Sequence, residues 1–177
     1  MSSLFLNGVY DLTLIKSIKA SGVQWGVDFR ARSSQFLPFH QFKEIVQHLS
    51  PVDQILIHFE EEKLETMLSF INLIQAENIK SRWNLVFRDN RPAHFYQQLN
   101  CHFSWFYHAS SDWREILTLD KLDRVIVPVV VAGELSDNFW DIVENRNLEV
   151  VLHFYSFQEL FSFKNINRDV SLSVDLT

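Results

Sequence analysis

The stretch LFLNGVYDLTLIKSIKASGVQWGVDF, residues 4–29, contains the pattern from which the fold of this chain can be predicted. An apolar run ends at Asn7, an amphipathic segment follows over residues 11–20, and a second apolar run begins near Val23. The apolar side chains of the middle segment recur every three residues, which is typical of one face of a helix. The stretch therefore predicts a strand, a helix and a second strand.

The same alternation continues along the whole chain. Eight short apolar segments are predicted as strands, at residues 4–7, 24–30, 54–59, 83–88, 102–108, 124–131, 149–155 and 170–176. Helical patterns separate them, at residues 11–20, 39–49, 60–76, 91–99, 111–119, 136–144 and 157–163. In the third and sixth segments, DQILIHF and RVIVPVVV, consecutive positions are apolar, as in parallel strands that are buried on both faces. We also expect Ser111 and Ser136 to cap the helices that they begin.

Eight strands that alternate with helices predict an α/β fold, a compact (β/α)8 TIM barrel in one domain over residues 1–177. No helical pattern follows the eighth strand, so we expect the barrel to lack its last helix. The chain has 177 residues, whereas such barrels usually have about 250. An open, doubly wound sheet is therefore the alternative.

Composition excludes several classes of function. The formal net charge is −6 and the pI about 5.6, so the chain has no general attraction to phosphate backbones, and we expect no nucleic-acid partner. No window approaches the ~18 apolar residues of a membrane span, and the first residues lack the features of a secretory signal. Cys101 is the single cysteine, which fits a reducing compartment. We expect a cytoplasmic protein with no membrane partner and no cofactor.

Several segments resemble those of a known enzyme family. ARSSQFLPFHQFKEIV, residues 31–46, is similar to PKSPRYVSPEQAREIV, which follows the second strand of phosphoribosylanthranilate isomerases, the (β/α)8 enzymes of tryptophan synthesis. Similar pairs along the chain are FLNG with KICG, SGVQWGVDF with AGADYIGFIF, ILIHFEEEKLETML with VGVFVNEDLEEIL, NLVFRDNRPAHFYQQL with QLHGDESPEYCEEL, AGELSDNFWDIV with GGTGKTFDWSLL, and RDVSLSVD with VDVSSGVE. The pairs occur in the same order over nearly the whole chain, which favours the barrel.

The resemblance also implies that both catalytic groups have been replaced. In the family, the cysteine of KICG is the general base and an aspartate at the end of the sixth strand is the general acid. Asn7 takes the first place, and an amide cannot accept a proton near neutral pH. Pro128 takes the second place and has no side-chain proton to give; Asp120 and Asp123 are expected to precede the strand.

The implied phosphate site is altered as well. The family presents backbone N–H groups from glycine-rich turns after strands six to eight. Of those glycines only Gly133 remains, and Glu134 beside it adds a negative charge. Gln35 takes the place of the family's substrate-binding arginine, for which Arg32 is a possible replacement.

In such a barrel, functional side chains lie at the carboxyl-terminal ends of the strands. As catalytic candidates we select Asn7, Asp28, His58 and Asp175. As ligand-binding candidates we select Arg30, Arg32, Arg88, His108, Gly133 and His153. His58, His108 and His153 end alternate strands and with Asp175 form a possible zinc set, but hydrogen bonding of each histidine to a neighbour is the stronger interpretation, and no metal is expected.

Three functions are compatible with the sequence. The first is a barrel that resembles phosphoribosylanthranilate isomerase, has lost the isomerase activity, and binds a small molecule at its strand ends or a protein partner. The second is an active isomerase, or a related sugar-phosphate isomerase, with substituted catalytic residues. The third is a metal-dependent hydrolase that uses the strand-end histidines. The missing last helix also suggests a homodimer, because it would leave apolar strand faces exposed.

Overall fold

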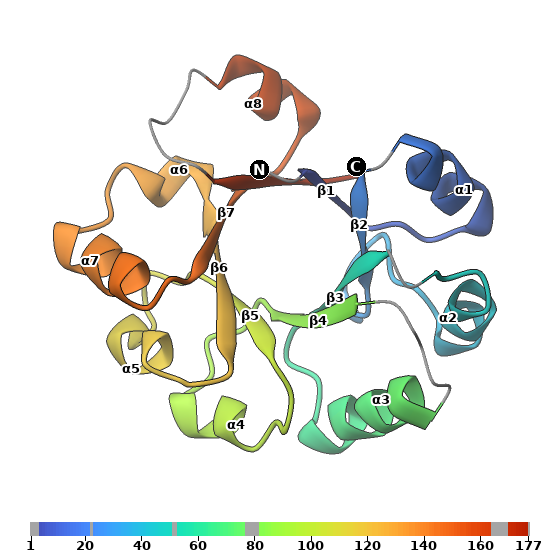
Figure 1. The fold of residues 1–177 in the computed structure, drawn as a ribbon, viewed down its shortest axis with the longest axis horizontal. Helices are drawn as coiled ribbons and strands as arrows, with labels where there is room; N and C mark the ends of the chain where they lie inside the picture. The colour runs from blue at the N-terminus through green and yellow to red at the C-terminus, as the bar shows by residue number, and fades with distance from the viewer. Residues whose placement is uncertain (1–3, 22, 51–52, 77–81, 164–169, 177) are drawn as a thin grey trace.

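The computed structural model describes residues 4–21, 23–50, 53–76, 82–163 and 170–176. Within them, eight parallel strands form a closed barrel in the order of the sequence, and β1 pairs with β8 to close it. Figure 1 shows the helices as a ring around the outside of the barrel. The (β/α)8 prediction is confirmed, and the open sheet is excluded.

The elements match the predicted alternation, with shorter helices after strands four and five. The strands are β1 (Leu4–Asn7), β2 (Gln24–Asp28), β3 (Gln54–Phe59), β4 (Arg82–Phe87), β5 (Phe103–Phe106), β6 (Leu122–Pro128), β7 (Glu149–Phe154) and β8 (Ser171–Asp175). The helices are α1 (Leu12–Ser21), α2 (Phe39–Val46), α3 (Leu64–Ala76), α4 (Ala93–Gln97), α5 (Trp113–Leu117), α6 (Val129–Ala132), α7 (Asp137–Asn145) and α8 (Phe157–Ser162). None of the described helices is long and apolar enough to cross a membrane.

The sixth strand differs most from its prediction. It begins at Leu122 and ends at Pro128, and the apolar residues that follow form the short helix α6. Proline has no N–H for the sheet ladder and has a φ that suits the start of a helix, which explains the break. Asp123 therefore lies inside the strand, although at its amino-terminal end.

Two details of the helix starts also differ. The acidic residues 60–62 precede α3 and are not part of it. Ser136 caps α7 as predicted, accepting a hydrogen bond from the N–H of Phe139. Ser111 is not a cap, because α5 begins after Asp112 and the hydroxyl of Ser111 donates to the carbonyl of His108.

Side chains alternate between the two faces of the barrel wall. Residues such as Val27, Ile57 and Phe87 are fully buried in the main hydrophobic cluster between strands and helices. A separate cluster of six apolar side chains fills the barrel interior: Phe5, Leu56, Val86, Phe106, Ile126 and Val151. We call this cluster the apolar plug. Burial of each such side chain contributes about 1.5–3 kcal/mol.

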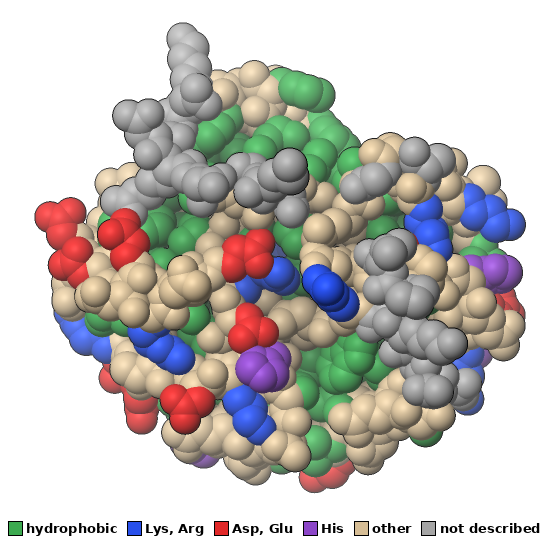
Figure 2. All heavy atoms as spheres, in the orientation of Figure 1, with side chains coloured by type: hydrophobic (Ala, Val, Ile, Leu, Met, Phe, Trp, Pro, Cys, Tyr) green, Lys and Arg blue, Asp and Glu red, His purple; other side chains and the backbone are tan. Residues whose placement is uncertain are grey.

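Charged side chains close the amino-terminal end of the barrel. Arg124 of β6 forms an ion pair with Glu149 of β7, and its guanidinium lies over the ring of Phe5 in the plug. Nearer the surface, His102 pairs with Asp123 at 2.8 Å. Figure 2 shows acidic, basic and histidine side chains gathered near the axis on the face that it presents. The plug thus separates this charged layer from the polar side chains at the carboxyl-terminal end of the barrel.

The barrel wall is covered less completely where it closes. No helix follows β8 within the described residues, so α8 and α1 flank the β1–β8 pair (Figure 1). The outward-facing side chains there are only partly buried, namely Leu4, Leu6, Leu172 and Leu176. Figure 2 also shows hydrophobic side chains over α8, where Phe161 is 82% exposed.

Candidate functional site

A polar layer fills the carboxyl-terminal end of the barrel, directly above the apolar plug. Because strand side chains alternate, the residue two positions after each plug residue also points inward. In this way Asn7 follows Phe5, and His58 follows Leu56. Likewise, Arg88 follows Val86, and His153 follows Val151. The sequence pattern that builds the plug therefore also places these polar groups together.

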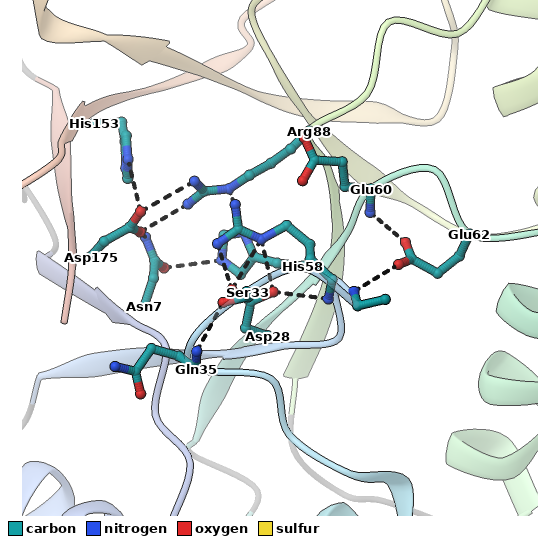
Figure 3. Close-up of polar contacts among 12 residues, drawn as sticks. Asn7, Asp28, Ser33, Gln35, His58, Glu60, Glu62, Arg88, His153 and Asp175 are labelled. Atoms are coloured by element: carbon teal, nitrogen blue, oxygen red, sulfur yellow. Dashed lines mark hydrogen bonds and ion pairs between the residues drawn. The ribbon is translucent and has the colours of Figure 1, made fainter. Parts of the chain in front are cut away.

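Three of these side chains, Arg88, His58 and Asn7, form a closed ring of hydrogen bonds with Asp175 of β8 (Figure 3), which we call the mouth ring. Arg88 Nη2 lies 2.9 Å from Asp175 Oδ1, and Arg88 Nε lies 3.2 Å from His58 Nδ1. His58 Nε2 lies 3.0 Å from Asn7 Oδ1. Asn7 Nδ2 donates to Asp175 Oδ1 at 3.2 Å and closes the ring.

The directions of these hydrogen bonds determine where the protons lie. A carboxylate only accepts, so the amide nitrogen of Asn7 faces Asp175 and its oxygen faces His58. The oxygen accepts, so His58 Nε2 carries a proton. The guanidinium of Arg88 only donates, so His58 Nδ1 is unprotonated. His58 is therefore a neutral imidazole with both nitrogens engaged.

The environment of His58 holds it in that neutral form. Its side chain is 1% exposed. Burial and the positive charge of Arg88 lower the pKa of His58 well below its ordinary value, against the opposing charge of Asp28. A base with so low a pKa, and with its lone pair already used, cannot take a proton from a substrate near neutral pH.

Asp175 carries the negative charge of the mouth ring. Burial opposes its ionisation, but the nearby His153 and the charge of Arg88 outweigh burial and hold the pKa of Asp175 far below its ordinary range. Arg88 is itself buried and lies over the face of Phe106, 4.7 Å from the ring centroid. Asp175 is thus a fixed counter-ion and has no proton to donate as an acid.

A second ion pair lies beside the mouth ring, between Asp28 at the end of β2 and Arg30 just after it. Arg30 Nε lies 2.8 Å from Asp28 Oδ1, and Arg30 also donates its backbone N–H to the same oxygen. Burial opposes the charge of Asp28, but the hydrogen bond from Arg30 prevails, and the pKa of Asp28 is lowered. Both arginines of the layer are therefore neutralised by aspartates within hydrogen-bond distance.

Ser173, His153 and Asp175 form a line that resembles a nucleophile, a base and an acid. His153 Nδ1 lies 3.0 Å from Ser173 Oγ, and His153 Nε2 lies 3.5 Å from Asp175 Oδ2. The second distance is too long for a good hydrogen bond. Ser173 and His153 are both 0% exposed, so no substrate can reach the hydroxyl. Burial also lowers the pKa of His153. In this conformation the three side chains therefore have a structural role and not a catalytic one.

Gly26 makes room for the mouth ring. A Cβ atom at this position of β2 would lie 2.9 Å from Asn7 Oδ1, closer than a Cβ atom normally approaches another atom, and 3.0 Å from His58 Nε2, which is also a tight contact. Sequence reasoning did not select Gly26. The sequence did contain an indication of its role, because a glycine inside a strand often marks the close approach of another group.

The other selected residues lie outside the mouth ring. His108 Nε2 lies 2.7 Å from the carbonyl oxygen of Arg88 and so contacts only its backbone. Arg32 is exposed and lies 3.8 Å from Glu61. Gly133 ends α6 with an ordinary φ of −77° and open space around it. Gln35 packs beside Gly8, which follows β1 with a φ of +81°.

The three strand-end histidines do not form a metal site. Each of the three histidines makes hydrogen bonds of its own, His58 to Asn7 and Arg88, His108 to the carbonyl of Arg88, and His153 to Ser173. Across the described ranges, no group of three or more His, Cys, Asp or Glu side chains could hold a metal ion. The interpretation of each histidine as hydrogen-bonded to a neighbour is confirmed by these contacts.

Comparison with known proteins identifies the fold. No protein-family model matches the sequence, and no curated protein matches it. Phosphoribosylanthranilate isomerase from Thermotoga maritima superposes with a TM-score of 0.70 at 15% identity, over 99% of this chain and 88% of that one. The isomerase from Thermus thermophilus gives 0.68 at 12% identity, over 98% and 86%. L-talarate dehydratase from Polaromonas, a structure with Mg and L-glucarate, gives 0.60 at 10%, over 99% and 53%.

These structures confirm the resemblance at the level of the fold. The isomerases are matched over almost their whole length, as the collinear sequence similarities predicted. The sequence identities are too low to carry over an activity.

Proposed function

We propose that this chain is a barrel of the phosphoribosylanthranilate isomerase type that has lost isomerase activity and binds a small molecule at the polar end of the barrel. The mouth ring is the observation that supports this proposal. Its four side chains satisfy one another, with a neutral imidazole and a fully ionised carboxylate. Such a ring stabilises structure and charge, and offers no group poised to exchange protons near neutral pH.

The positions of the lost groups support the same conclusion. The Amadori rearrangement needs a general base and a general acid on opposite sides of the substrate. Asn7, in the place of the base, is engaged with His58 and Asp175 through both ends of its amide. Pro128, in the place of the acid, ends β6. Both roles are therefore vacant.

The ligand would be small and polar, without a large net charge. Arg88 and Arg30 are each paired with an aspartate, so the layer is close to neutral. The partly exposed side chains of Arg30 and Asp175, at 19% and 20%, would contact such a ligand. Tyr155, half-exposed and with its ring centroid 4.9 Å from that of His153, would cover it.

An active isomerase with substituted residues is the second candidate. The approach of His153 to Asp175 favours it, because a rearrangement that brought water to this pair would create an acid and a base. The two candidates differ in turnover. We would follow the fluorescence of phosphoribosylanthranilate with the purified chain, and test complementation of a tryptophan auxotroph that lacks the isomerase.

The proposal predicts no turnover above the background rate and no growth. Loss of a general acid and a general base typically costs ~10²–10⁴-fold for each group. Growth of the auxotroph, or turnover that His153→Gln abolishes, would establish the second candidate. The metal-dependent hydrolase has no support among the described residues, which form no metal-binding group.

Self-association is a further part of the proposal. The partly buried leucines outside β1 and β8, with the exposed Phe157 and Phe161 of α8, form an apolar surface where the barrel closes. A two-fold interface would cover it in both copies at once. We also retain a single domain and a cytoplasmic location as proposals, the latter because Cys101 is the single cysteine.

A further inference from the structure

A second candidate site lies outside the barrel wall, between α2 and α3. There a cavity of about 470 Å³ opens to the surface, a volume within the range of small-molecule sites. Most of its wall is aromatic, formed by Phe29, Phe36, Phe39, Phe59 and Phe70. We call this cavity the phenylalanine pocket. It lies on the opposite side of β2 and β3 from the mouth ring, because Asp28 and His58 point inward and Phe29 and Phe59 outward.

The floor of the phenylalanine pocket is a cluster of buried rings that pack edge to face. Phe29 and Phe70 have ring centroids 4.4 Å apart, and Phe59 lies 5.5 Å from Phe70. These three side chains are at most 7% exposed. A site with such a floor is formed in advance, so binding costs little ordering of side chains.

The upper wall of the pocket consists of phenylalanine side chains that are exposed to solvent, although such apolar side chains are usually buried. Phe36 is 43% exposed and Phe39 is 41% exposed. Phe36 belongs to the loop before α2, where its backbone bridges Asp28. Two exposed rings that border an open apolar cavity mark a binding surface more strongly than scattered exposed side chains do.

One charged side chain lines the pocket among the described residues, namely Glu62. Its two oxygens accept the backbone N–H groups of Glu60, at 2.5 Å, and Ala31, at 3.4 Å, which hold the carboxylate in place. Figure 3 shows Glu62 apart from the mouth ring. Burial raises the pKa of Glu62, as expected for a carboxylate at an apolar wall that forms no ion pair with the residues the structure describes.

We propose that the phenylalanine pocket binds a small organic cation with an apolar or aromatic body. Aromatic faces attract a cation through their quadrupoles, and the attraction strengthens where water is excluded. Glu62 supplies the opposite charge, and no basic residue lines the cavity within the described chain. At the rim of the cavity, Lys43 Nζ lies 5.7 Å from the centroid of Phe39, which precedes it by one turn of α2.

Three probes of nearly equal size test the proposal: 2-phenylethylammonium, 2-phenylethanol and phenylacetate. Their binding to the full chain would be measured by ligand-observed NMR titration at pH 7. We expect a dissociation constant on the order of 1 mM for the cation, as for a fragment of this size. The alcohol should bind roughly tenfold more weakly, and the anion should not bind measurably.

Variants assign the binding to this pocket. Glu62→Gln should remove the preference for the cation over the alcohol and leave the alcohol's affinity unchanged. Glu65→Gln is the matched control, because Glu65 lies in the first turn of α3 and does not line the cavity. Phe39→Ala should weaken both ligands by about tenfold or more, and thermal unfolding would confirm that each variant is folded.

Two results would overturn the proposal. The first is equal affinity for cation and alcohol, or a preference that survives in Glu62→Gln. The second is self-association of the chain that Phe36→Ser abolishes, because a second copy would then be the occupant of the pocket. The turnover assay on the isomerase substrate bears on neither result, so the phenylalanine pocket and the mouth ring are tested separately.

Discussion

His58 Nε2 lies 3.0 Å from Asn7 Oδ1 inside the barrel, and this contact fixes the protonation of the imidazole. The amide oxygen of Asn7 can only accept, so His58 donates from Nε2 and keeps Nδ1 for Arg88. An asparagine at the end of the first strand thereby connects a histidine to an aspartate on the last strand. The residue in the place of a catalytic base acts as a structural link.

The space for this link depends on Gly26, so Gly26→Ala should destabilise the fold. The added Cβ atom would lie within 3.0 Å of both Asn7 and His58, and both are held by other hydrogen bonds. We expect a loss of ~1–3 kcal/mol in the free energy of unfolding, measured by urea titration. Gly133→Ala is the control, because open space surrounds Gly133, and it should change stability by less than about 0.5 kcal/mol.

The two buried histidines predict how stability varies with pH. The pKa values of His58 and His153 are lowered in the folded chain, whereas an unfolded histidine titrates near 6.5. Below about pH 7 the unfolded state therefore binds more protons, and stability falls as the pH decreases. The slope should reach about 1.4 kcal/mol per pH unit for each histidine. The lowered pKa values of Asp28 and Asp175 act in a separate window, below about pH 4.

Urea unfolding at pH 5.5, 6.5 and 7.5 measures this slope. His153→Gln should reduce it by about half, whatever its effect on stability at neutral pH. His40→Gln, at an exposed position of α2, should leave the slope unchanged. A wild-type free energy that is constant between pH 5.5 and 7.5 would contradict the assignment of both histidines as neutral and buried.

The sequence predicts much of this layer because a barrel strand repeats every two residues. Asn7, Asp28, His58, Arg88, His153 and Asp175 follow from that period and from the strand ends. The hydrogen bonds and ion pairs among these residues do not follow from the period, because they depend on the stagger of the strands and on side-chain rotamers. Likewise, the strand–helix boundary at Pro128 was missed because the valines after it are apolar in either structure.

The ion pair between Arg88 and Asp175 should contribute strongly to stability when one partner is removed. Asp175→Asn leaves the buried guanidinium of Arg88 without a counter-charge, and such losses typically cost ~3–5 kcal/mol. Asp123→Asn breaks the exposed pair with His102 and should cost at most about 1 kcal/mol. Urea unfolding of the two variants at pH 7.5 compares them directly. Equal losses would mean that the mouth ring is not a cooperative unit.

Restoring the family's catalytic residues should not restore activity. In Asn7→Cys with Pro128→Asp, the thiol can replace neither the acceptor for His58 nor the donor to Asp175, so the mouth ring opens. The glycine-rich phosphate turns are still absent, with Gly133 facing open space. We expect a folded but less stable chain with no turnover of phosphoribosylanthranilate. Turnover by this double variant would show that a phosphate site survives elsewhere at the barrel mouth.

The exposed apolar surface near the barrel closure predicts self-association. Phe161 of α8 is 82% exposed and stacks on Phe157 with ring centroids 6.2 Å apart, so most of its side chain is left in solvent, and the leucines of β1 and β8 are only partly buried. A second copy placed across a two-fold axis would bury both features. Light scattering at micromolar concentration should give about twice the monomer mass of 20.9 kDa. Phe161→Ser should shift the chain towards the monomer, whereas Val130→Ser, at another exposed apolar position, should not. A wild-type monomer at all concentrations would show that this surface remains open in solution.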